Sequence, residues 1–133
     1  MKAHRFGAGL VAAIAFGGAA GTVARAAVEE AWQTGATDFP WATFVVNLAG
    51  SLLLGLLVAG LERSAPSRYP RALLGTGFCG GFTTFSTFSV ETDSLVRAGR
   101  SGIAVVYAIV STAGGLLALW VGARFARLRR REV

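Results

Sequence analysis

The chain has 133 residues, a length that favours a single domain. Its mean hydropathy is +0.56 and 15% of its residues are charged, a smaller fraction than in most soluble proteins. A net charge of +6 would suit a nucleic-acid-binding protein, but the basic residues lie in short segments between long apolar runs. We therefore expect an all-α membrane protein that binds no nucleic acid and has no soluble domain.

Four windows of the chain contain no charged residue, namely 6–24, 39–61, 72–90 and 101–123. Each has about 19 to 23 residues, and a helix of that length crosses the roughly 30 Å hydrocarbon core of a bilayer. We predict one four-helix transmembrane domain over residues 1–133, with spans at about 6–28, 39–61, 72–97 and 101–123.

The basic residues are unevenly divided between the two faces of the membrane. With four spans, Arg25, Arg97 and Arg100 share one face with several carboxylates. The face that holds both termini carries ten: Lys2, Arg5, Arg63, Arg68, Arg71, Arg124, Arg127, Arg129, Arg130 and Arg131. By the positive-inside rule, both termini are predicted to be cytoplasmic. The basic C-terminal segment fits a topology anchor better than a lipid-binding switch.

The first and second spans carry small and polar residues in helical register. Gly17, Gly18 and Gly21 give the first span a small face, which allows helices to approach closely in lipid. In the second span, Thr43, Asn47 and Ser51 follow at i, i+4 and i+8, and therefore share one face. Polar residues at membrane depth mark either a contact between helices or a pathway, and the pattern alone leaves both roles open for Asn47.

The third span reads "GFCGGFTTFSTFSVE" at residues 77–91, where a glycine pair is followed by hydroxyls and phenylalanines. Unwound backbone at membrane depth is tolerated only inside protein or beside a cavity. We predict that the helix breaks at Gly80-Gly81 and that the following hydroxyls satisfy the freed backbone groups. Phe85 and Phe88 are three residues apart and share a face, a pattern most often used for core packing. In the fourth span, Tyr107 and Ser111 are four residues apart.

No enzyme is expected from this set of residues. The single histidine, His4, is terminal, and the single cysteine, Cys79, lies inside the third span. The remaining groups at membrane depth are an amide, hydroxyls and aromatic ring edges. Each of these can point the positive end of a dipole at an ion, so a path lined by them suits an anion better than a cation.

Four segments, in chain order, are similar to the CrcB (Fluc) fluoride-channel family. The third-span sequence quoted above resembles its most specific signature, and "GGAAGTVAR", "TFVVNLAGSLLLG" and "YAIVS" resemble its patterns in the first, second and fourth spans. The resemblance implies an antiparallel dimer with two fluoride pores and a structural Na⁺ between the subunits. It implies passive export of cytoplasmic fluoride across the bacterial plasma membrane.

The resemblance also implies roles for individual residues. The backbone carbonyls of Gly80 and Thr83 would hold the Na⁺, and Arg25 would sit at the pore mouth or fix a helix end. Glu91 matches an acidic position near the pore. The pore or fluoride residues would be Asn47, Phe85, Phe88, Tyr107, Ser111, Thr43 and Thr84.

Two alternatives accompany this assignment. The strong Lys/Arg bias differs from family members that insert in both orientations, so the dimer could be a homodimer or a heterodimer with a paired homologue. The competing class is a small four-span antiparallel multidrug exporter. That class requires a glutamate embedded in its first helix, and residues 6–24 contain none.

Overall fold

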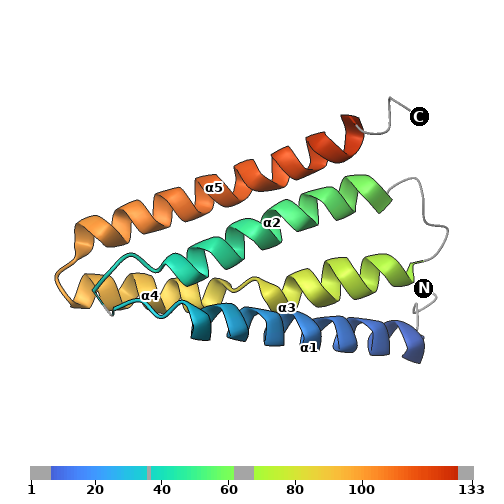
Figure 1. Cartoon of the computed structure of the whole chain (residues 1–133), viewed down its shortest axis with the longest axis horizontal. Helices are drawn as coiled ribbons and strands as arrows, with labels where there is room; N and C mark the ends of the chain where they lie inside the picture. Colours follow the sequence, from blue (N-terminus) through green and yellow to red (C-terminus); the bar gives the residue numbers. More distant parts are fainter. Residues whose placement is uncertain (1–6, 36, 62–67, 129–133) are drawn as a thin grey trace, which may run out of the picture.

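The computed structural model describes residues 7–35, 37–61 and 68–128. Across these ranges the chain is helical and contains no strand. Figure 1 shows four rods that run alternately back and forth along the long axis of the molecule. The elements in order are α1 (Ala8–Ala31), α2 (Trp41–Leu61), the π-helical η1 (Arg71–Cys79), α3 (Gly80–Phe82), α4 (Phe85–Arg97) and α5 (Ser101–Leu128).

Three of these helices are long and apolar enough to cross a membrane. They are α1, α2 and α5, with 24, 21 and 28 residues. The third rod consists of η1, α3 and α4 in succession, and it spans the bundle in Figure 1 as the single helices do. The chain is therefore a multi-pass helical membrane protein. The predicted start of the first span, at residue 6, lies outside the described residues.

The third rod is interrupted at a different place from the one predicted. Gly80 keeps helical dihedral angles, with φ −65° and ψ −34°. The extended residues are Thr83, with φ −80° and ψ 155°, and Thr84, with φ −143° and ψ 122°. The prediction that the helix breaks at the glycine pair is therefore wrong, because the interruption follows at the two threonines.

One member of the glycine pair serves helix packing. A Cβ atom at Gly81 would clash with the backbone carbonyl oxygen of Gly18 in α1. Gly17 and Gly21 are equally close to backbone atoms of the third rod, at Leu73 and Phe78. The predicted small face of the first span is confirmed, and it brings η1 and α3 into backbone contact with α1.

A second pair of glycines joins α2 to α5. Gly55 abuts the carbonyl of Leu119, and Gly122 abuts the carbonyl of Leu52. The bundle thus consists of two closely packed pairs, α1 with η1–α3 and α2 with α5. At one end a small apolar cluster forms around the buried Tyr107 and connects α4 to α5.

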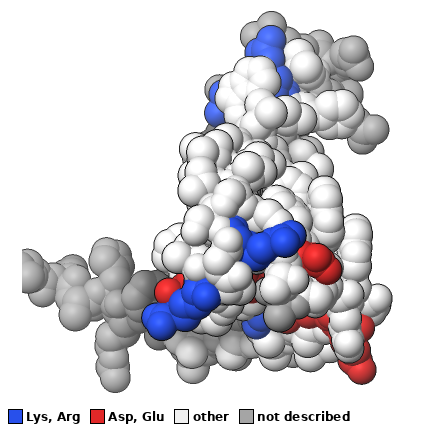
Figure 2. Space-filling model, turned by 90° about the vertical axis from the view of Figure 1, so that its left-hand side faces the viewer, with Lys and Arg blue, Asp and Glu red and all other residues white. Residues whose placement is uncertain are grey.

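Charged side chains differ between the two ends of the molecule. Figure 2 views the end where α4 meets α5, and both blue and red groups gather there. The described acidic residues, Glu29, Glu30, Asp38, Glu91 and Asp93, belong to this half. At the other end, the described charged residues are all arginines, at 68, 71, 124 and 127. The remaining basic residues used to predict the orientation lie outside the described ranges: Lys2, Arg5, Arg63, Arg129, Arg130 and Arg131.

Candidate functional site

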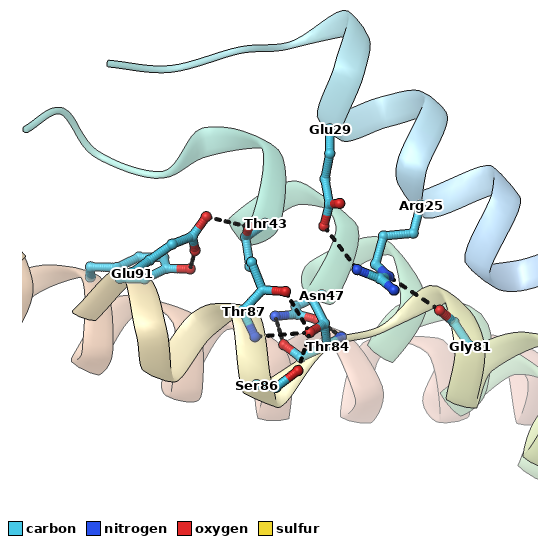
Figure 3. Close-up of polar contacts among 10 residues, drawn as sticks. Arg25, Glu29, Thr43, Asn47, Gly81, Thr84, Ser86, Thr87 and Glu91 are labelled. Carbon is cyan, nitrogen blue, oxygen red and sulfur yellow. Dashed lines mark hydrogen bonds and ion pairs between the residues drawn. The ribbon is translucent and has the colours of Figure 1, made fainter. Parts of the chain in front are cut away.

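Asn47 of α2 bridges the interruption in the third rod. Its Nδ2 donates to the carbonyl oxygen of Thr84 at 2.9 Å, and the backbone N–H of Thr84 donates to its Oδ1 at 2.8 Å (Figure 3). The amide side chain thereby satisfies both the backbone N–H and the backbone C=O of the extended Thr84, as a neighbouring β-strand would. One N–H of the Asn47 amide has no hydrogen-bond partner among the described residues, so it can still donate.

Thr84 also starts the helix that follows it. Its Oγ1 accepts a hydrogen bond from the backbone N–H of Thr87 at 3.1 Å and donates to the Thr87 Oγ1 at 2.9 Å. The Ser86 hydroxyl lies 3.3 Å from the same oxygen. This is the geometry of an N-cap, and it explains why α4 begins at Phe85. Threonine is one of the favoured N-cap residues, and the sequence interpretation did not use this signal for a helix start.

Arg25 of α1 contacts the other side of the interruption. Its Nε donates to the carbonyl oxygen of Gly81 at 3.3 Å, and its Nη1 pairs with Glu29 at 3.3 Å (Figure 3). In a continuous α-helix, Gly81 would accept from the backbone N–H of Phe85. The guanidinium supplies a replacement donor where that helical bond is lost. Sequence reasoning alone did not identify the Arg25–Gly81 contact.

Two further carbonyls at the interruption lose their usual helical donors. The N–H of Thr84, which would bond Gly80 in a continuous helix, is turned to Asn47. The N–H of Thr87, which would bond Thr83, is taken by the Thr84 hydroxyl. Gly80 is exposed on the surface of the subunit. The carbonyls of Gly80 and Thr83 are therefore left as candidate acceptors or metal ligands.

Glu91 links three helices through its carboxylate. Thr43 of α2 donates to its Oε1 at 2.8 Å (Figure 3). Tyr107 of α5 donates to its Oε2 at 2.7 Å. Thr43 is 1% exposed and Tyr107 is fully buried. Both hydroxyl protons are thus committed to the carboxylate in this conformation. An anion would meet the oxygen lone pairs of these two hydroxyls unless they turned away from Glu91.

The two phenylalanines occupy different environments. The centroids of their rings are 5.7 Å apart, and Phe88 also lies 5.1 Å from the Tyr107 ring. Phe88 is partly buried against the apolar cluster, whereas Phe85 is 80% exposed. Core packing, the usual role of such a pair, therefore describes Phe88 but not Phe85 within this subunit.

A groove of about 530 Å³ lies beside the interruption. The wall contributed by α5 contains Ser111 and Thr112, and Ser51 of α2 faces the same space. The Ser111 hydroxyl oxygen is buried and has no hydrogen-bond partner among the described residues. The predicted site residues that line the groove are Asn47, Gly80, Thr83, Thr84, Phe85, Phe88 and Ser111.

Other predicted residues lie outside this groove. Thr43, Tyr107 and Glu91 form the separate hydrogen-bonded cluster described above, and Arg25 lies on the α1 side of the interruption. The groove also includes Gly75 and Thr76 of η1, which the sequence interpretation did not select. No charged side chain lines the groove among the described residues. Its polar groups are an amide, hydroxyls and backbone groups, interleaved with aromatic rings.

Comparison with known proteins assigns the chain to a family. Residues 12–123 match the family described as "CrcB-like protein, Camphor Resistance (CrcB)". A protein of Mycobacterium tuberculosis (strain CDC 1551 / Oshkosh) named "Fluoride-specific ion channel FluC 1" is 45% identical over 124 residues, which cover 90% of this chain and 94% of the relative. A protein of Chlorobaculum tepidum named "Fluoride-specific ion channel FluC" is 49% identical over 113 residues, covering 84% and 90%. The chain belongs to the CrcB family, as its motifs indicated.

Proposed function

We propose that this chain is a subunit of a fluoride-selective channel through which cytoplasmic fluoride leaves the cell passively. Its similarity, along most of its length, to relatives named as fluoride-specific ion channels carries this proposal. Those relatives are channels and not enzymes, in agreement with the absence of a catalytic set from the sequence. The groove beside the third rod supplies a chemical reason for the same function.

Fluoride is small and strongly hydrated, so its passage requires close donors that replace water. The groove offers the free N–H of Asn47, the Ser111 hydroxyl and the ring edges of two phenylalanines. An aromatic edge carries the positive rim of the ring quadrupole, and apolar rings also exclude water. Neutral donors can release the ion again, which conduction requires. An inside-negative potential favours exit of an anion by about 2.3 kcal/mol per 100 mV.

The functional unit is proposed to be an antiparallel dimer. Three features support a second subunit beside the groove: Phe85 is exposed, the Ser111 hydroxyl has no partner among the described residues, and Gly80 faces open space. A second copy or a paired homologue would cover these groups and enclose the groove. The Lys/Arg bias favours insertion with both termini in the cytoplasm of a bacterial cell, so an antiparallel homodimer requires some inverted copies.

A structural Na⁺ is proposed at the centre of that dimer. Among the described residues, no three His, Cys, Asp or Glu gather to hold a metal ion, so a cation here would depend on backbone oxygens. The carbonyls of Gly80 and Thr83 fit, because the N–H groups that a helix would offer them are bound elsewhere. Two carbonyls are too few for a hard cation, and the partner subunit would complete the set.

Transport by the purified protein in liposomes tests the proposal. Vesicles loaded with fluoride or chloride should release fluoride rapidly and retain chloride, without ATP or a proton gradient. Empty liposomes and liposomes with Asn47→Asp protein serve as controls for leakage. Comparable chloride efflux would contradict fluoride selectivity. Efflux that requires a proton gradient would favour the exporter class instead.

A further inference from the structure

The last turns of α5 form a second, separate hollow that two arginines line. It has a volume of about 330 Å³ and is lined by Trp120, Ala123, Arg124 and Arg127. Neither guanidinium makes a hydrogen bond or an ion pair with any part of the chain that the structure describes. Trp120 is 61% exposed. The hollow therefore combines two guanidinium groups that have no acidic partner among the described residues with an accessible indole ring.

Two arginines at the opposite end of the bundle have acidic partners on their own helices, unlike Arg124 and Arg127. There, Arg25 pairs with Glu29 and Arg97 pairs with Asp93, each four residues away on its own helix. Arg124 and Arg127 have no acidic residue at the corresponding positions, since 120, 123, 128 and 131 are Trp, Ala, Leu and Arg. A charged ligand from outside the chain could supply the missing counter-charge.

The surroundings of the hollow identify an amphiphile as the ligand. Arg124 and Arg127 are three residues apart and lie on one side of α5, where both guanidinium groups can donate hydrogen bonds to one phosphate. Toward the middle of the bundle, the same helix exposes Leu117, at 60%. Trp120 lies between the charged and the apolar parts, the level at which tryptophan is enriched at membrane interfaces.

We propose that this hollow binds the phosphate headgroup of an anionic phospholipid. The two arginines hold the phosphate, Trp120 packs against the glycerol region, and the acyl chains lie along the exposed apolar face of α5. Basic pockets on the cytoplasmic side of membrane proteins recognise such headgroups. The basic end of α5 would then bind lipid at a defined position as well as set topology. This inference does not depend on fluoride transport.

Quenching of tryptophan fluorescence by brominated lipid tests the proposal directly. The chain has three tryptophans, so Trp32→Phe and Trp41→Phe leave Trp120 as the only one. The full chain in this background is reconstituted in phosphatidylcholine with a small fraction of brominated phosphatidylglycerol or, in parallel, brominated phosphatidylcholine. We expect stronger quenching by the anionic lipid, corresponding to an enrichment of about fivefold for each arginine.

Variants separate a site from general electrostatic attraction. Arg124→Gln with Arg127→Gln should remove the preference, whereas Arg97→Gln with Arg100→Gln, which also deletes two positive charges, should preserve it. If neutral variants fail to insert, Arg124→Lys with Arg127→Lys keeps the charge and should still lose most of the preference, because an ammonium cannot bind phosphate in the bidentate manner. Equal loss in the Arg97 and Arg100 control, or full preference in the lysine variant, would overturn the proposal.

A final arm distinguishes lipid from soluble phosphate. Inorganic phosphate is added at fixed ionic strength, with sodium chloride as the matched salt. The lipid site predicts unchanged quenching, because the apolar face of α5 contributes to binding. Displacement of the brominated anionic lipid by phosphate alone would show a free-anion site and would contradict the proposal.

Discussion

The two halves of the third rod are attached to the bundle in different ways. The first half, η1 and α3, contacts α1 through backbone, at Gly17, Gly21 and Gly81, where no side chain could be inserted. The second half, α4, is held by side chains, above all by the carboxylate of Glu91 between Thr43 and Tyr107. Backbone contacts fix a helix tightly, whereas a few hydrogen-bonded side chains allow local adjustment.

This difference matters because the two halves carry different groups. The backbone-packed half holds Gly80, whose carbonyl is a proposed Na⁺ ligand. The side-chain-held half begins with Phe85 and Phe88, the proposed pore phenylalanines. Asn47 binds the extended Thr84 between the halves and sets their relative position. Substitutions on the two sides should therefore affect assembly and conduction to different degrees.

The largest effect is expected on the backbone-packed side. Gly81→Val places a branched side chain against the Gly18 carbonyl and should separate η1–α3 from α1, so that folded protein is lost. Gly80→Ala is the matched control, because a Cβ there meets nothing within 4 Å in the subunit. Size-exclusion profiles and thermal unfolding in detergent measure both. A well-folded Gly81→Val protein would show that the α1 contact is looser than described.

Gly80→Ala also sharpens the dimer proposal. Alanine favours a helix by up to about 1 kcal/mol over glycine, so the isolated subunit should be at least as stable. If Gly80 faces a partner subunit, the added methyl should instead weaken dimerisation or Na⁺-dependent stability. Cross-linking and unfolding in sodium against N-methylglucamine would report this change. Unchanged dimerisation would place the interface elsewhere.

The junction between the halves should give the next largest effect. Asn47→Asp keeps an acceptor for the Thr84 N–H but turns an oxygen toward the Thr84 carbonyl, where a donor is needed. An unsatisfied buried group costs about 1–3 kcal/mol. If the whole of that cost raises the free-energy barrier to permeation, fluoride flux should fall by roughly 5- to 160-fold. Ser51→Ala, one turn further along the same face, should change flux little. Equal flux in both variants would contradict the role of Asn47.

Much of the fold could be predicted because bilayer thickness limits what each segment can be. Charge-free windows indicated long apolar helices, of which α1, α2 and α5 are present, and the small face of the first span was correctly predicted. The predicted position of the break was wrong because glycine can serve either close helix packing or a helix break, and local sequence does not distinguish the two. Gly81 provides close packing with α1, and the backbone unwinds where Asn47, from a distant helix, offers a matching pair of hydrogen bonds.

The site could be predicted less completely. Helical spacing placed Thr43, Asn47 and Ser51 on one face, and all three do face the third rod or the groove beside it. Spacing could not show that the Thr43 and Tyr107 hydroxyls both turn to Glu91, because that contact joins three helices. The resemblance supplied their possible roles in a pore. Those roles, the Na⁺ site and the partner subunit stay predictions, since they depend on groups outside a single chain.

A smaller effect is expected from the cluster that holds α4. Tyr107→Phe removes one hydrogen bond to Glu91 while keeping the ring contacts with Phe88. Hydrogen bonds between membrane helices contribute about 0.6 kcal/mol on average and up to about 1.7. We expect a loss of stability in this range, a normal dimer, and fluoride flux reduced by less than in Asn47→Asp. A double-mutant cycle with Glu91→Gln measures the coupling, and additive effects would show that the hydrogen bond contributes nothing.

The smallest effect is expected at the Arg25 contact on the α1 side. Arg25 binds both the Gly81 carbonyl and Glu29, and these two interactions can be removed separately. Glu29→Gln removes a partly exposed ion pair, which contributes about 0–1 kcal/mol, and leaves the bond to Gly81 in place. Fluoride flux should change by less than about twofold, because a small loss of folding stability need not raise the free-energy barrier to permeation.

Arg25→Gln is the informative comparison for this contact. Glutamine is shorter than arginine and cannot reach both partners, so the Gly81 carbonyl should lose its donor next to the interruption. If Arg25 acts by holding that carbonyl, flux and stability should both fall further than in Glu29→Gln, with no change in selectivity over chloride. Reconstituted flux of the two ions, measured with each variant, distinguishes the possibilities. A loss of selectivity in Arg25→Gln would instead indicate that the guanidinium meets the permeating ion at the pore mouth. Equal small effects in the two variants would show that the backbone glycine contacts fix η1 and α3 without help from any side chain.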